Sequence, residues 1–125
     1  MSVPVGLEEL AARIDERVMG PYLLTSDDDG RPHATAIALR WEGAELVGPC
    51  GRSSARNATA RSAVSVLWPP DEPGGYSLIA DAEATIEPVG DGRQVRLCPT
   101  HAILHRPAEV PDPTTDCAHD CRPVL

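Results

Sequence analysis

The stretch CGRSSARNATAR, residues 50–61, combines helix-forming residues with hydroxyls and arginines. Ser53 is a good helix N-cap, because its hydroxyl can accept a bond from a free amide one turn later, and the Ala-rich run at 55–63 predicts a short helix. Arg52 and Arg56 flank its first turn, where free N–H groups and the helix dipole favour an anion. The group suits a phosphate monoester. By itself, the run is also typical of a capped helix with solvated arginines.

Composition and charge exclude several function classes. The chain has 125 residues, 42% of them apolar, which is enough for one domain with a core. A net charge of −8 without any basic run makes nucleic acids and anionic membranes poor partners. No segment approaches the roughly 20 apolar residues that span a bilayer, and the N-terminus lacks the apolar region of a signal peptide. We therefore expect a cytoplasmic protein whose four cysteines are thiols.

Strand patterns and turn residues alternate on both sides of residues 50–61. Before them, Leu10 and Ile14 belong to an apolar stripe with helical spacing, which predicts an amphipathic helix of about three turns from Leu7 to Val18. Three aspartates and Gly30 at 27–30 indicate a hairpin turn rather than a calcium loop, since the spaced oxygen ligands are absent. Six runs are typical of strands: 22–25, 31–40, 44–47, 63–68, 76–87 and 93–105.

Six strands with short hairpins and a single helical crossover predict an antiparallel sheet that closes on itself. The expected fold class is therefore mainly β, a β-barrel with short flanking helices. We place this domain at residues 1–106. Residues 107–125 are rich in proline and acidic side chains and are interpreted as an extended tail.

Five short segments point to a known family. They are YLLT at 22–25, DGRPH at 29–33, SSARN at 53–57, AVSVL at 63–67 and DAEA at 81–84. Through these segments the chain resembles the pyridoxamine 5′-phosphate oxidase-like family, the FMN-binding split barrels, over residues 7–107. The resemblance implies a six-stranded antiparallel split barrel that forms a homodimer, with FMN in a groove between the subunits.

The resemblance also implies a binding site and a function. The phosphate is expected at the turn between strand and helix, and the flavin ring beside the second and third strands, at about residues 33–37 and 48–51. The implied cofactor-binding residues are His33, Ala34, Thr35, Gly51, Arg52, Ser53, Arg56 and Asn57. We expect an FMN-dependent oxidoreductase acting on an unidentified small molecule, with no catalytic residue assigned, because the cofactor carries the redox step.

Two alternatives share the fold. One is a non-enzymatic protein that binds flavin or haem; His33, His101 and His105 are candidate haem ligands, although no spacing singles one out. The other is a deazaflavin-dependent reductase. The acidic tail of a deazaflavin favours a basic groove, and few cations besides Arg52, Arg56 and Arg61 are available, so FMN is preferred.

The cysteines suggest no further site. Cys117, His119 and Cys121 lie close together in the tail, but the spacing is not a standard zinc pattern, so no metal is predicted there. Cys50 and Cys98 are interpreted as small buried side chains rather than nucleophiles.

Overall fold

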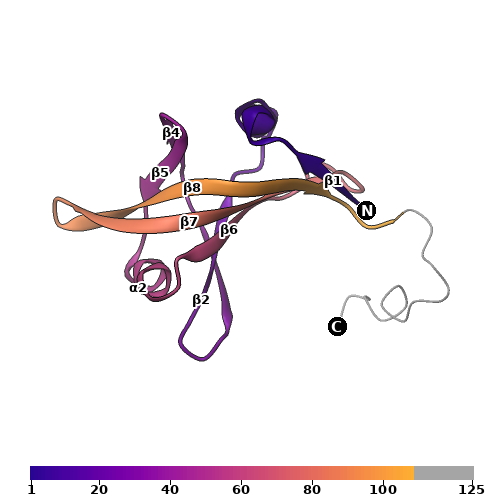
Figure 1. Ribbon diagram of the computed structural model, residues 1–125. Helices are drawn as coiled ribbons and strands as arrows, with labels where there is room; N and C mark the ends of the chain where they lie inside the picture. Colours follow the sequence, from indigo (N-terminus) through magenta and orange to yellow (C-terminus); the bar gives the residue numbers. More distant parts are fainter. Residues whose placement is uncertain (109–125) are drawn as a thin grey trace.

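The computed structural model describes residues 1–108, and most of its regular structure is strand (Figure 1). The strands are β1 Ser2–Val5, β2 Tyr22–Ser26, β3 Pro32–Ala36, β4 Arg40–Glu42, β5 Glu45–Pro49, β6 Ala63–Trp68, β7 Ser77–Val89 and β8 Gly92–His105. The helices are the 3₁₀ turn η1 Leu7–Glu9, α1 Leu10–Asp15 and α2 Arg52–Ala60. None of the helices in this part of the chain has the length and hydropathy needed to cross a membrane.

The strands form one antiparallel sheet with the order β3-β2-β6-β7-β8-β5-β4, and β1 pairs with β8. The two ends of this path, β3 and β4, are joined by residues 37–39, so the sheet curls back on itself. The linker meets β5 at Gly48, where a Cβ would overlap the carbonyl oxygen of Ala38. Only glycine therefore allows the two backbones to approach this closely.

The long β7–β8 hairpin is the central element of the sheet. It runs across the whole molecule in Figure 1, from β1 at one end to β5 and α2 at the other. Alternate residues of β7 are buried, as its period-2 pattern predicts. The core consists mainly of aliphatic side chains and includes Leu10 of α1, Val66 of β6, Leu78 of β7 and Leu97 of β8, each at most 1% exposed.

The mainly β class predicted from the sequence is confirmed, but the sheet has eight strands rather than six. β1 is additional, and the expected strand at 31–40 is interrupted: β3 ends at Ala36, and β4 begins at Arg40 and runs beyond the expected end to Glu42. The interruption has a physical cause at 37–39. The Ile37 amide still donates to the Pro21 carbonyl (3.1 Å), the next position of the β2–β3 ladder, but proline has no N–H with which to continue the ladder, and the Ala38 carbonyl then lies against Gly48.

The first helix is shorter than predicted. Leu10 and Ile14 face the core as expected, but α1 ends at Asp15, and Val18 is 83% exposed. The Asp71 carboxylate accepts hydrogen bonds from the backbone amides of Val18 and Met19 (3.1 and 2.9 Å). These bonds satisfy amides that an extended helix would have used, so the chain leaves the helix early.

Candidate functional site

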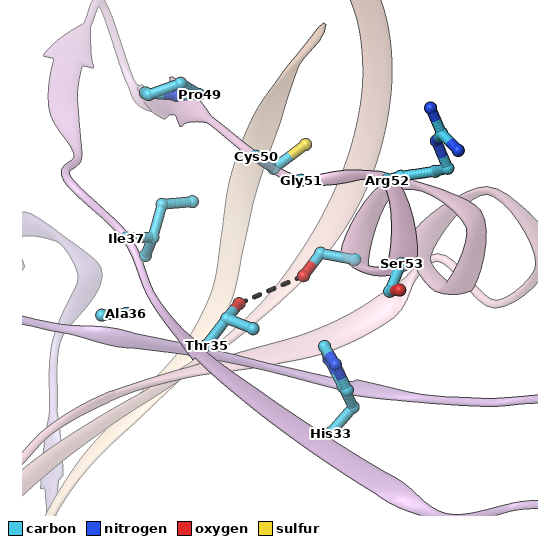
Figure 2. A pocket seen from close by; sticks show the side chains of 10 residues that line it. His33, Thr35, Ala36, Ile37, Pro49, Cys50, Gly51, Arg52 and Ser53 are labelled. Atoms are coloured by element: carbon cyan, nitrogen blue, oxygen red, sulfur yellow. Dashed lines mark hydrogen bonds between the residues drawn. The ribbon is translucent and has the colours of Figure 1, made fainter. Parts of the chain in front are cut away.

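A pocket of about 430 Å³ lies between β3, the end of β5 and the start of α2 (Figure 2). Its polar lining comes from His33, Thr35, Gly51, Arg52, Ser53 and Ser54. Its apolar lining comes from Ala36, Ile37, Pro49 and Cys50. The pocket thus has an apolar wall on one side and a helix N-terminus on the other, and its size falls in the range typical of small-molecule sites.

Helix α2 is held over this pocket by polar links to the β2–β3 hairpin. The hydroxyls of Thr35 and Ser54 lie 3.1 Å apart, and Figure 2 draws this bond across the pocket. One turn further on, the Asn57 side-chain amide donates to the hydroxyl of Thr25 (3.1 Å). At the end of the helix, the Arg61 guanidinium donates to the Ser26 carbonyl (2.9 Å). Because the links are spread along the helix, they fix its start relative to β3.

The first turn of α2 is suited to an anion. Its N-cap is Gly51, in an extended conformation and without a side-chain acceptor, so Ser53 is not the cap that the sequence predicts. The first amide that bonds back is that of Ala55, which donates to the Gly51 carbonyl (3.0 Å). The preceding amides of the turn have no intrahelical acceptor, and no acidic side chain occupies this turn. They are left to face a ligand together with the exposed Ser53 hydroxyl.

His33 offers a second donor or acceptor inside the pocket. Its ring points toward the start of α2 in Figure 2. Its Nδ1 atom is buried and has no hydrogen-bond partner among residues 1–108. A buried polar atom without a partner is costly, so a ligand that bonds to it gains free energy. These features fit a ligand with a flat apolar part and an anionic group, as the resemblance implies for FMN.

Cys50 lines the pocket as a neutral side chain. Burial raises the pKa of its thiol above the usual range, and the nearby Arg93 guanidinium offsets part of this rise. The thiol therefore stays protonated near neutral pH, in agreement with the interpretation that it is not a nucleophile. Cys50 is half-buried rather than buried, and the expectation of burial is wrong for Cys98, which is exposed because it pairs with Glu83 on the solvent face of the β7–β8 hairpin.

Five of the eight predicted binding residues line this pocket, and three do not. The five are His33, Thr35, Gly51, Arg52 and Ser53. Ala34 is exposed on the opposite face of β3, since side chains alternate along a strand. Asn57 is 1% exposed and bonded to Thr25 within the protein. Arg56 lines a neighbouring pocket instead.

Some lining residues are not among the eight named binding residues, although Ile37 lies within the stretch beside which the flavin ring was expected. Ile37 follows His33 and Thr35 at the strand spacing of two, so the alternation of β3 contained the signal. Arg61 was expected to be one of the few cations available to an anionic ligand, but its guanidinium pairs with the carboxylate of Asp28 (2.9 Å). Arg93 lines the same pocket as Arg56. It comes from β8, and only the fold brings it near α2.

The other histidines lie outside the pocket. His101 is 3.6 Å from the carboxylate of Asp81, and His105 shares a 3.0 Å hydrogen bond with the Ser2 hydroxyl. Within residues 1–108, no group of three or more metal-ligating side chains comes together. The tail residues Cys117, His119 and Cys121 lie outside the described residues.

Two curated proteins are close in sequence. An uncharacterised protein of Mycobacterium bovis and another of Mycobacterium tuberculosis are each 37% identical to this chain over 132 aligned positions, which cover 94% of this chain and 92% of each relative. No family model matches the chain. The sequence relatives thus extend over almost the whole chain but carry no assigned activity.

Solved structures show the same fold. A candidate pyridoxamine 5′-phosphate oxidase of Listeria innocua superposes with a TM-score of 0.65 at 16% identity, covering 78% of this chain and 96% of that one. An F420 reductase gives 0.59 at 23% identity, covering 80% and 98%. The haem storage protein HutZ of Vibrio cholerae gives 0.55 at 19% identity, covering 79% and 94%. At these identities the likeness establishes the architecture and leaves the ligand open.

Proposed function

This chain belongs to the same family as the two mycobacterial proteins and has the split-barrel fold of the pyridoxamine 5′-phosphate oxidase-like proteins, and from this premise we propose that it is a flavin-dependent oxidoreductase. The proposed cofactor is FMN, and the substrate is a small molecule. The single observation that carries the proposal is the open first turn of α2, which faces the apolar wall across the 430 Å³ pocket. An anionic group and a flat ring system can be accommodated there together.

The proposed binding mode follows from the donors on α2. The free amides of the first turn, the Ser53 hydroxyl and the Arg52 guanidinium hold the phosphate. A guanidinium binds phosphate in a bidentate manner, and the helix dipole adds to the attraction. Arg56, one turn further along the helix, adds positive charge near the phosphate without lining its pocket.

The ring part of the ligand lies against the apolar wall. Ile37 and Pro49 exclude water from this side, and the neutral Cys50 thiol adds no charge. His33 bonds to a polar edge of the ring through Nδ1, the buried atom that has no partner among residues 1–108. Bound FMN supplies hydride and electron transfer, so the chain itself needs only to bind, orient and shield.

A second copy of the chain completes the site in this proposal. β3 is an edge of the sheet, and within residues 1–108 no strand pairs with its outer side. Ala34 and Ala36 are exposed on it, and such small side chains permit the close approach of another subunit. We propose a homodimer in which the partner covers this region and closes the flavin groove. Size-exclusion chromatography with light scattering tests this proposal. The mass of two chains supports the homodimer, and the mass of a single chain contradicts it.

His33 supports one alternative function. It lines the pocket with a half-buried imidazole, and a histidine ring nitrogen is a usual ligand of haem iron, so His33 is the candidate haem ligand. In this alternative the chain stores or carries haem, and it performs no flavin chemistry.

The test is a visible spectrum of the purified protein, followed by titration with FMN, a deazaflavin and haemin. Bands near 370 and 450 nm, roughly the positions of free flavin, that appear with FMN support the proposal. A Soret band that disappears in a His33→Ala variant favours the haem alternative. If the deazaflavin binds more tightly than FMN, we conclude that the deazaflavin is the cofactor. Turnover with a reduced nicotinamide then separates an enzyme from a carrier, since a carrier binds flavin without turnover.

A further inference from the structure

A second pocket, of about 460 Å³, adjoins the first and shares only Arg52 with it. We call it the arginine basin. Its lining residues are Arg52, Arg56, Arg93, Ala55, Thr59, Ala60 and Ile86. Three of these seven residues are cations, in a chain whose net charge is −8. The basin is therefore an unusual concentration of positive charge for this protein.

The fold brings the three arginines together from two elements. Arg52 and Arg56 are four residues apart on α2, so they lie on one face of the helix. Arg93 comes from β8, where it pairs with Pro88 of β7 near the tip of the long hairpin. Helix α2 packs against both strands of this hairpin, and Figure 1 shows it beside that end.

The basin contains no opposing charge. Within residues 1–108, the side chains of Arg52, Arg56 and Arg93 form no salt bridge and no hydrogen bond. Elsewhere in this part of the chain most arginines have a carboxylate partner: Arg13 with Glu16, Arg40 with Glu42, Arg61 with Asp28, and Arg96 with Glu42, Glu45 and Glu87. Acidic residues are thus plentiful, but none of them neutralises the basin.

The lack of an opposing charge is most unfavourable in free energy at Arg93. Its side chain is half-buried, so it has lost part of its hydration without gaining a partner. A guanidinium in that position is stabilised when an anion is bound, because a charge-assisted hydrogen bond replaces the lost water. The positive charge of Arg93 also acts on the first pocket, because it offsets part of the rise that burial causes in the pKa of the Cys50 thiol. The basin and the first pocket are therefore electrostatically connected.

We propose that the arginine basin is a second anion subsite, which shares Arg52 with the first pocket but is centred on Arg56 and Arg93. It binds a phosphate or carboxylate group that belongs to a ligand in the first pocket or lying beside it. The inference rests on the proposed function in one respect, because it places this second anion next to the flavin. The group has two possible sources: the second phosphate of a dinucleotide flavin, or the acid group of the substrate.

The test uses inorganic pyrophosphate as the probe, in calorimetric titrations of the full chain with and without FMN at constant ionic strength. We expect one equivalent to bind in the presence of FMN. Arg56→Ala and Arg93→Ala each weaken this binding about tenfold, the loss that follows from removing one charge-assisted hydrogen bond. Arg93→Gln keeps most of the side-chain bulk and gives the same loss, which excludes a packing defect as its cause.

The matched control is Arg31→Ala. Arg31 is exposed and lines neither pocket, so its replacement removes the same charge without touching the basin. An equal loss of pyrophosphate affinity in the Arg31 and Arg93 variants means non-specific attraction and overturns the proposal. Stoichiometric displacement of FMN by pyrophosphate also overturns it, because the basin then holds the flavin's own phosphate.

The result does not depend on the success of the flavin proposal. If no flavin binds, the proposed function fails, and pyrophosphate binding to the chain alone still decides whether the basin is an anion subsite. If FMN binds, comparison with FAD identifies the source of the anion. Tighter binding of FAD that is lost in Arg93→Ala assigns the basin to the cofactor. Equal binding of FAD and FMN, with pyrophosphate still bound, assigns it to the substrate.

Discussion

The side-chain amide of Asn57 lies 3.1 Å from the hydroxyl of Thr25, and both residues are buried, at 1% and 4% exposure. This bond ties α2 to β2 underneath the candidate site. Buried polar groups that lose their partner cost more than the bond itself is worth. The pair therefore determines where the first turn of α2 lies relative to β3.

We predict that Asn57→Ala lowers the free energy of unfolding by about 2 kcal/mol, from the lost bond and the void left in a buried site. Thr25→Val, which keeps the shape and removes the hydroxyl, leaves the Asn57 amide unsatisfied and has a smaller but clear effect. Urea unfolding of both single variants and the double variant measures their coupling. The control, Thr85→Val on the exposed face of β7, stays within about 0.5 kcal/mol of the wild type. Additive effects of the two core changes would contradict the account.

The contact between Gly48 and Ala38 gives a second prediction. A Cβ at Gly48 overlaps the Ala38 carbonyl oxygen, which is backbone and cannot move aside, so Gly48→Ala destabilises the fold by about 3 kcal/mol. Gly20→Ala is the matched control, since a Cβ at Gly20 would meet nothing within 4 Å and its φ is not in the left-handed region. Thermal unfolding compares the two. Equal melting temperatures for both variants would show that the closure of the sheet at this point is looser than described.

Acid sensitivity is expected at Glu87. Hydrogen bonds from Gln94 and Arg96 lower the pKa of this carboxyl below its usual range. A folded-state pKa below the unfolded value means that the stabilisation is present above the unfolded pKa and is lost as the pH falls through the folded one. Glu87→Gln should therefore show a smaller loss of stability on acidification than the wild type, and the difference should shrink in high salt. An NMR titration of the Glu87 carboxyl checks the direction, and a raised pKa would refute it.

The two cysteines of the described part should differ in reactivity. Cys50 has a raised pKa and is half-buried, whereas Cys98 is exposed. Because the thiolate is the reactive form, iodoacetamide should modify Cys98 several-fold faster at pH 8. Arg93→Ala should slow Cys50 further, since it removes a charge that favours the thiolate. Peptide mass spectrometry resolves the two sites. Faster labelling of Cys50 in that variant would contradict the placement of Arg93.

Sequence patterns predicted local features better than contacts between segments that are far apart in the sequence. The alternation in β7 and the glycine turn after Asp29 depend on neighbouring residues, and the structure has both. The break at 37–39 depends on Gly48, ten residues beyond Ala38, and on Pro21, whose missing N–H ends the ladder with β2, so no pattern within the strand itself indicates it. The extension of the sheet by β1 likewise depends on the far end of β8.

The residues of the candidate site fall into the same two groups: those that local sequence identifies and those that depend on distant contacts. Five of its residues belong to two short segments, 33–35 and 51–53, and the sequence identifies both. Asn57 was expected to be a ligand because the family resemblance implies it, but the rotation of the helix turns its side chain into the core. Arg93 was missed for the opposite reason. It is distant in sequence, and only the packing of α2 on the β7–β8 hairpin brings it to Arg56.

The central claim is that the first turn of α2 holds a phosphate, and it is tested most directly by the ratio of FMN affinity to riboflavin affinity. The two ligands share the ring and differ by the phosphate, so the ratio isolates that group. We predict that the wild type binds FMN at least about tenfold more tightly than riboflavin, and that Arg52→Ala removes most of this preference without changing riboflavin affinity. Arg31→Ala should retain the preference. Equal affinities for the two ligands in the wild type, or a preference that survives Arg52→Ala, would contradict the account.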